Sequence, residues 1–271
     1  MTKPGVWMSL LAATAFSASA QVTVEVTQPQ DQFLPGEALP VTVRIMNLSG
    51  QTLHFGGDSD WLTFSLESRE GAVVPQFGSI PVFDPFDLPS SRTASKRIDL
   101  GPCFPVIQVG RYHIIANVKI KELGHEIASQ PKGLDIIDGV GLWQQDVGVP
   151  PAPGQTNAIP EVRRYILQQA NYVKGRARLY LRVTDLTGAR PPRVALIGPL
   201  LSFSRPEQRI DQDSNLHVLY QDGPHSFSYS KFDPDAVLLA RQTHDYVGTR
   251  PRLRLDPDGN VFVFGGVRRI A

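Results

Sequence analysis

Cysteine is nearly absent from this sequence: Cys103 is the only one among 271 residues. A single thiol cannot form a disulfide within the chain, and zinc sites built from cysteine clusters are excluded as well. The segment around it, "LGPCFPVI", is apolar, whereas a reactive thiol needs a basic and partly open setting. We therefore expect a buried, unreactive thiol.

The short motifs of common catalytic sites are absent too. The sequence contains no Gly-x-Ser-x-Gly and no phosphate-binding Gly-rich loop. The stretch "HEIAS" stops short of a zinc-protease motif, because Ser129 stands where the second histidine is needed. We expect no catalytic residues, no metal and no cofactor, and lean against an enzyme.

Long apolar runs are absent after the first twenty residues, so we expect no transmembrane segment in the mature chain. Residues 1–20 hold one lysine, an apolar stretch from Val6 to Phe16, and Ala18-Ser19-Ala20 before Gln21. This pattern is typical of a secretory signal peptide; a short membrane anchor is the alternative, but the stretch is too short to span a bilayer comfortably. The mature protein is therefore predicted to be secreted, either periplasmic or extracellular.

Net charge is close to zero, +1, but the charge is unevenly distributed. Residues 21–150 carry 9 Lys and Arg against 15 Asp and Glu, which is −6, whereas residues 151–271 carry 17 against 11, which is +6. An arginine-rich half suits an anionic polymer. Docking of two oppositely charged domains, or ordinary solvated strand faces, explains the same split. Nucleic acid is not expected as a partner.

Short alternating runs separated by turns dominate residues 21–138 and predict a β-sandwich. The segment "PGEALPVTVRIMNLSG" resembles the second-strand entry of bacterial immunoglobulin-like domains, with Val41, Val43 and Ile45 facing the core and Asn47 ending the strand. "VGRYHI" resembles a tyrosine corner, in which the hydroxyl of Tyr112 would bond to nearby backbone. An immunoglobulin-like sandwich is the expected fold.

A Pro-rich linker is expected over residues 139–160, with Trp143 packed against the preceding domain. The segment "PEVRRYILQQANYV", residues 160–173, then predicts one helix, because Pro160 and Glu161 suit a first turn and Val162, Ile166, Ala170 and Val173 recur at helical spacing. Residues 161–271 are thus expected to form a helix plus a β-meander.

An internal repeat marks the C-terminal part. "RIDQDSNLHVLY" and "RLDPDGNVFVF" share one pattern and begin 45 residues apart, at Arg209 and Arg254. A four-strand period of this length is the size of a β-propeller blade, but residues 161–271 hold too few blades to close a ring. We expect an antiparallel, blade-like meander, an incomplete propeller. The Asp residues fail calcium-loop spacing in both copies, so hairpin turns are favoured over metal sites.

The mature chain as a whole resembles uncharacterised secreted bacterial proteins that join an immunoglobulin-like domain to a short propeller-like repeat region. The resemblance implies the mainly β architecture and carries no catalytic residue with it.

Two sets of residues form the candidate binding surface. In "RARLYLRV" the apolar residues alternate with Arg178, Tyr180 and Arg182, and in "RPRLRL" the leucines alternate with Arg252 and Arg254. Period two places each set on one sheet face. Such a face suits carboxylate, sulfate or phosphate groups; a wet sheet face, or the face that meets the acidic domain, is the alternative.

Three functions remain open at this point. The first is a secreted, non-enzymatic binding protein of the bacterial envelope, with an envelope protein or an anionic polymer or glycan as partner. The second is a carbohydrate-binding or glycan-degrading accessory protein, by analogy of fold alone. The third is a structural subunit that completes a sheet or ring with other copies as a homo-oligomer.

Overall fold

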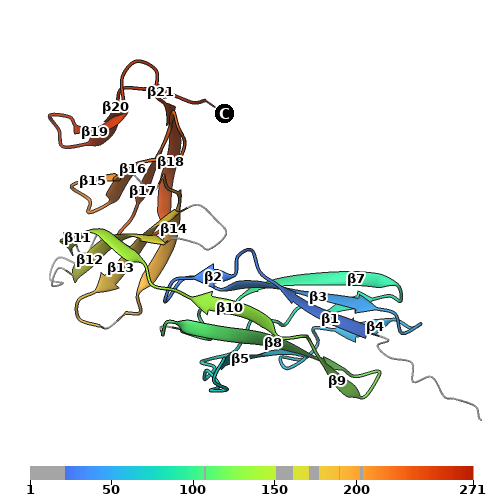
Figure 1. Cartoon of the computed structure of the whole chain (residues 1–271). Coiled ribbons are helices and arrows are strands. Elements are labelled where there is room, and N and C mark those ends of the chain that lie inside the picture. Colours follow the sequence, from blue (N-terminus) through green and yellow to red (C-terminus); the bar gives the residue numbers. More distant parts are fainter. Residues whose placement is uncertain are drawn as a thin grey trace, which may run out of the picture.

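Every regular element in the described part of the chain is a β-strand (Figure 1). The computed structural model describes residues 22–106, 108–150, 161–170, 177–188, 190–201 and 204–270. Within these ranges no helix is long and apolar enough to cross a membrane. The predicted signal peptide, residues 1–20, lies outside the described residues.

Two sheets form the N-terminal sandwich, which comprises strands β1 to β10. One sheet has the order β1-β3-β7, and the other has the order β2-β10-β8-β5 with β9 paired to β8. All these pairs are antiparallel except β2 with β10. The strands are β1 (Val22–Thr27), β2 (Gln32–Phe33), β3 (Pro40–Asn47), β5 (Leu62–Ser68), β7 (Arg92–Asp99), β8 (Gly110–Ile120), β9 (His125–Ala128) and β10 (Lys132–Ile136), with the short pair β4 (Leu53–Phe55) and β6 (Phe86–Leu88) beside them.

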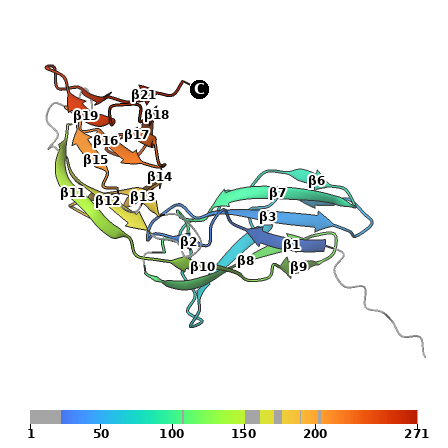
Figure 2. The same ribbon diagram turned by 45° about the horizontal axis from the view of Figure 1, so that its top comes forward.

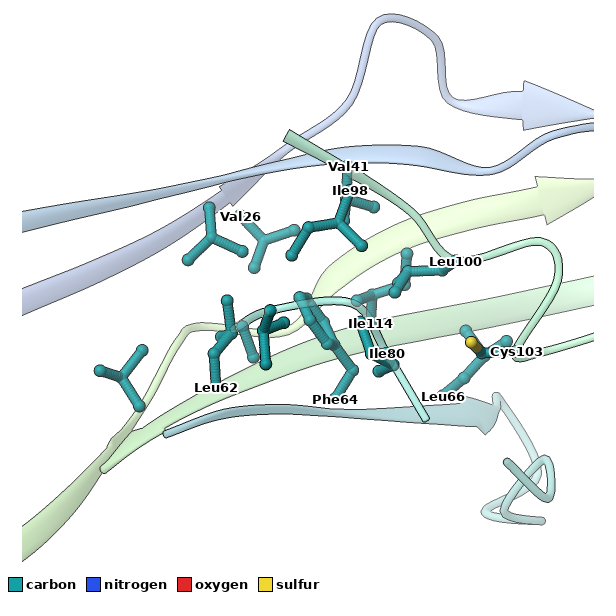
Figure 3. Packing of buried hydrophobic residues seen from close by; sticks show 14 of the residues in the cluster. Val26, Val41, Leu62, Phe64, Leu66, Ile80, Ile98, Leu100, Cys103 and Ile114 are labelled. Atoms are coloured by element: carbon teal, nitrogen blue, oxygen red, sulfur yellow. The ribbon is translucent and has the colours of Figure 1, made fainter. Parts of the chain in front are cut away.

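One hydrophobic core lies between the two sheets, because strands such as β3, β5 and β8 bury every second residue. Val41, Val43 and Ile45 of β3 are buried as predicted, and Figure 3 shows Val41 across from the side chains of β5 and β8. Cys103 is also buried, 3.7 Å from the carbonyl oxygen of Ser79. The expected burial of this thiol is confirmed.

Two polar side chains tie the ends of these strands to the backbone. Asn47 ends β3 as predicted, and its fully buried amide donates to the carbonyls of Gln51 and Leu88 at 2.8 Å. The hydroxyl of Tyr112 donates to the carbonyl of Gln108 at 3.0 Å, so the predicted backbone tie is confirmed.

The C-terminal unit comprises strands β11 to β21 in three consecutive antiparallel layers (Figure 2). The first is β11-β12-β13-β14, the second is β15-β16-β17-β18-β21, and the third is the hairpin β19-β20. Their bounds are β11 (Val140–Val149), β12 (Glu161–Ala170), β13 (Arg178–Asp185), β14 (Arg193–Pro199), β15 (Glu207–Ile210), β16 (Leu216–Gln221), β17 (Ser226–Phe232), β18 (Leu238–Asp245), β19 (Arg252–Leu255), β20 (Val261–Phe264) and β21 (Val267–Arg268). Each of these sheets is open in the part of the chain that the structure describes.

The predicted helix at 160–173 is wrong: Glu161–Ala170 is the inner strand β12. It pairs with β11 on one side and β13 on the other, so two hydrogen-bonded ladders outweigh the helical preference of its Leu, Gln and Ala residues. The side chains of Arg163, Tyr165 and Leu167 are buried at every second position, which is the period of a strand.

The predicted linker is also wrong in its first half, because residues 140–149 form β11. Trp143 packs against the core of the C-terminal unit, whereas the sequence favoured the preceding domain. The rest of the predicted linker, residues 151–160, lies outside the described residues.

Three hairpin corners of the C-terminal unit share one geometry. They begin at Asp211, Asp233 and Asp256, and the carboxylate of each accepts the backbone N–H four residues later at 2.7–2.8 Å. The backbone N–H of each Asp donates to the carbonyl of that same later residue at 3.0 Å. The fourth residue of each corner has positive φ: Ser214, Ala236 and Gly259. The repeat in the sequence is therefore a repeated turn, as expected.

Replacing Tyr112 by Phe is expected to lower the free energy of unfolding by about 1 kcal/mol, because the Gln108 carbonyl loses its donor while the ring stays packed. Urea denaturation followed by circular dichroism measures the change. Tyr246→Phe is the matched control, since this exposed hydroxyl makes no hydrogen bond within the described ranges. Equal stability of both variants and the parent would contradict the role given to Tyr112.

Candidate functional site

The predicted residues of β13 lie on the face that meets the N-terminal sandwich. Tyr180 is fully buried and packs with Leu34 and Ala170 in a small apolar cluster between the two units. The guanidinium of Arg178 is hydrogen-bonded to the side chain of Gln30. Docking of the acidic N-terminal unit, one of the alternatives drawn from the sequence, accounts for both residues.

Glu37 is the charged centre of this junction. Its carboxylate accepts the backbone N–H of Leu34 at 2.8 Å and the amide of Gln30 at 3.1 Å, and the hydroxyl of Tyr180 bonds to it. Burial raises the pKa of Glu37, while these hydrogen bonds and the charge of Arg178 oppose the rise. The backbone of Glu37 also bridges to Val194 of β14, so the two units share one bridge of sheet pairing.

The other predicted residues, Arg252 and Arg254, lie on β19, in the hairpin farthest from the sandwich (Figures 1 and 2). Arg252 is directly opposite Phe264 and Arg254 is directly opposite Phe262 in the ladder. Opposite residues of an antiparallel pair point to the same side, so two Arg and two Phe side chains share one face. We name these four residues the Arg/Phe face.

The Arg/Phe face is exposed. Phe262 and Phe264 are 42% and 53% accessible, and both arginines are exposed, with Arg252 paired to Glu207 of β15. The opposite face of the hairpin is apolar and packs through Leu253, Val261 and Val263 on the second sheet. The structure thus separates the five predicted residues into two distant sets, and adds two phenylalanines that sequence reasoning missed. The alternation of "VFVF" against "RLRL" is the signal that could have found them.

A hollow of 400 Å³ lies beside the hairpin, between it and strands β17 and β18. Tyr229, Gln242, His244 and Arg268 line it together with β20 and Gly265-Gly266. Burial lowers the pKa of His244, and the charge of Arg268 lowers it further. The hollow therefore offers neutral donors and acceptors and one arginine next to the Arg/Phe face.

The corner at Asp211 carries a buried polar network that the sequence did not reveal. One carboxylate oxygen lies 2.9 Å from both Nε2 of His217 and Nζ of Lys231, and Nδ1 of His217 lies 2.8 Å from the hydroxyl of Tyr229. Since an ionised carboxylate only accepts, Nε2 carries the proton and Tyr229 donates to Nδ1.

The pKa values in this network fit a structural role. Burial lowers the pKa of His217 despite Asp211, and burial raises the pKa of Tyr229. The pKa of Asp211 lies well below its usual value, because hydrogen bonds from His217, Asn215 and Lys231 outweigh burial. A neutral imidazole and a protonated phenol clamp the ionised corner to β16 and β17. Among the described residues, no three His, Cys, Asp or Glu side chains form a metal-binding group.

Comparisons with known proteins place the chain in no family. No family model and no curated protein sequence matches it. Among solved structures it is similar to the sporulation control protein Spo0M from Bacillus subtilis, with a TM-score of 0.32 and 8% sequence identity over 66% of this chain and 90% of that one.

Asp211→Asn is expected to lower the free energy of unfolding by about 2 kcal/mol, because Lys231 and His217 lose a partner that is largely buried. Asp256→Asn is the matched control: the same corner in the outer hairpin, where the carboxylate accepts only from its own turn. Urea denaturation compares the two. A loss for Asp256→Asn as large as that for Asp211→Asn would contradict the network.

The same network predicts a loss of stability in mild acid. The pKa of His217 is lower folded than unfolded, so below about pH 6.5 the unfolded chain binds a proton that the folded chain resists. The contribution of His217 to the free energy of unfolding is fully present above that pH. It falls as the pH drops toward the pKa of His217 in the folded protein. His217→Gln should flatten the profile in this window, measured as urea midpoint against pH. His244 contributes in the same direction, so His244→Gln is the companion variant.

Proposed function

We propose that the protein is a non-enzymatic binding protein whose contact surface is the Arg/Phe face. The observation that supports this is the pairing of Arg252 with Phe264 and Arg254 with Phe262 on an exposed sheet face. Within the described residues, Arg254 has no ion-pair or hydrogen-bond partner, so its five N–H donors face solvent.

An anionic polysaccharide is the ligand that fits this surface best. A guanidinium binds a carboxylate or sulfate group through two parallel hydrogen bonds, and the apolar face of a sugar ring packs on an aromatic ring. Such a polymer carries charged groups beside its rings, and on this hairpin the two arginines of β19 lie beside the two phenylalanines of β20. The hollow that Arg268 and Gln242 line would extend the surface for a longer chain.

The proposal includes the type of each unit: an immunoglobulin-like sandwich followed by an open, propeller-like stack of sheets. The tie of Tyr112 to Gln108 and the two packed sheets support an immunoglobulin-like sandwich. The two consecutive four-stranded meanders, β11 to β14 and β15 to β18, support an open propeller-like stack. In such a stack the hairpin is the last layer, and its outer face is available to a partner.

The proposed compartment is the periplasm or the cell exterior. It is supported by the signal-peptide pattern of residues 1–20, which a cleavage at Ala20–Gln21 would remove. An anionic polysaccharide of the envelope would be accessible to the protein in this proposed compartment.

Alginate binding is expected to weaken about tenfold in Arg254→Ala, because one charge-assisted contact is lost. Phe262→Ala should weaken it as well, and added salt should weaken the parent. Affinity electrophoresis in gels with alginate, dextran sulfate or neutral dextran measures this. The matched control is Arg92→Ala/Arg97→Ala, two exposed arginines on β7 of the sandwich.

Each outcome separates the proposal from its rivals. Retardation by both charged polymers but not by dextran supports an anionic ligand, and retardation by dextran alone supports neutral carbohydrate instead. Parent-like retardation of Arg254→Ala, or equal loss in the β7 control, would contradict the Arg/Phe face. If polymer has no effect and mass photometry shows a dimer that Phe262→Ala dissociates, the face binds a second copy, as a structural subunit requires.

A further inference from the structure

A cleft of 460 Å³ lies where the sandwich meets the C-terminal unit, lined by residues of both. Four segments line it: residues 33–39 between β2 and β3, residues 99–106 after β7, residues 191–195 leading into β14, and the corner at 235–236. Ile136 of β10 and Arg182 of β13 complete the lining. Its size is that of an ordinary small-molecule site, and sites of this kind occur preferentially between domains.

The lining of the cleft is mainly apolar. The sandwich contributes Leu39, Phe104 and Val106, and the C-terminal unit contributes a Pro191-Pro192 pair and Val194. Pro102 and Pro105 on the sandwich side and Pro191-Pro192 on the C-terminal side restrict the backbone of these two lining segments, because the proline ring fixes φ. The walls are therefore shaped in advance to take an apolar body.

The three carboxylates that line the cleft, those of Asp99, Glu37 and Asp235, all have partners within the protein. Asp99 accepts the backbone N–H groups of Leu39 and Gly101 at 2.8 and 3.0 Å. Glu37 is bonded across the junction as described above, and Asp235 lies 3.1 Å from Arg163. These three carboxylates are each neutralised or hydrogen-bonded within the protein.

Arg182 differs from them. It is a half-buried residue of the lining, and within the described ranges its guanidinium has neither an ion-pair nor a hydrogen-bond partner. Arg193, at the start of β14, lies 3.8 Å from Asp235 and shares that carboxylate with Arg163 and Arg190. A cation that is partly removed from water without a partner costs free energy, which an anion would recover.

We propose that the cleft binds a small amphipathic anion, a carboxylate with an apolar tail. The carboxylate pairs with Arg182, and the tail lies between Leu39, Phe104 and the prolines. This site is separate from the Arg/Phe face and does not depend on the function proposed for it.

Isothermal titration calorimetry with dodecanoate, kept below its micelle concentration, tests the site. Dodecanol supplies the same tail without charge, and acetate supplies the charge without the tail. We expect the parent to bind dodecanoate clearly more tightly than either. Arg182→Gln should weaken dodecanoate by about tenfold or more, and should leave dodecanol unchanged.

A second variant tests the volume of the site. Ala38 is an exposed residue of the lining, so Ala38→Trp fills the cleft without disturbing the core, and should abolish dodecanoate binding. Arg44→Gln, an exposed arginine on β3, is the control and should bind like the parent. Circular dichroism and the thermal midpoint verify that each variant is folded.

Several results would overturn the inference. These are parent-like dodecanoate binding in both Arg182→Gln and Ala38→Trp, equal affinity for dodecanol and dodecanoate, or binding only to vesicles of anionic phospholipid and not to free dodecanoate. Alginate retardation of Arg182→Gln stays at the parent level if the Arg/Phe face acts as proposed, so failure of one site leaves the other measurable.

Discussion

The buried contact of Tyr180 with Leu34 and Glu37 fixes how the two units of the chain meet. A ring with no solvent exposure, an apolar neighbour and a hydrogen-bonded carboxylate leave little freedom at this point. The cleft that Arg182 lines lies at this same junction, where the backbone bridge from Glu37 to Val194 joins the β2–β3 loop to β14. A half-buried carboxylate at such a contact also favours this docking, since in another arrangement Glu37 would lose the hydroxyl of Tyr180 and the charge of Arg178.

Burial of apolar side chains also determines how the layers of the C-terminal unit stack, because the apolar residues on both faces of each sheet must be covered. Leu34 of the sandwich covers Tyr180 on the outer face of the first sheet. A shared core that includes Leu181 and Val218 lies between the first and second sheets, and the apolar side of the terminal hairpin covers Leu219 on the far side of the second. The outer side of that hairpin is where the described layers end, which is why its phenylalanines are exposed.

The parts of the fold that could be predicted from the sequence are those where local pattern and tertiary environment agree. Val41, Val43 and Ile45 alternate in the sequence and face one core, and the Asp corners combine turn residues with positive φ. The segment Glu161–Ala170 could not be predicted, because its residues also fit a helix and only the ladders of β11 and β13 decide the outcome. Period alone cannot distinguish the two for a short segment of mixed residues.

The candidate sites show the same division. An alternating strand predicts which side chains share a face: Arg178, Tyr180 and Arg182 on β13, and Arg252 and Arg254 on β19. It does not predict what covers that face, and burial by a separate unit is what turned Tyr180 into an interface residue. The two copies of the Asp corner illustrate the point: their turns are alike, yet only Asp211 lies where β16 and β17 bring His217, Tyr229 and Lys231 to it. The position of each corner in the stack of layers, more than its own residues, determines which side chains contact its carboxylate.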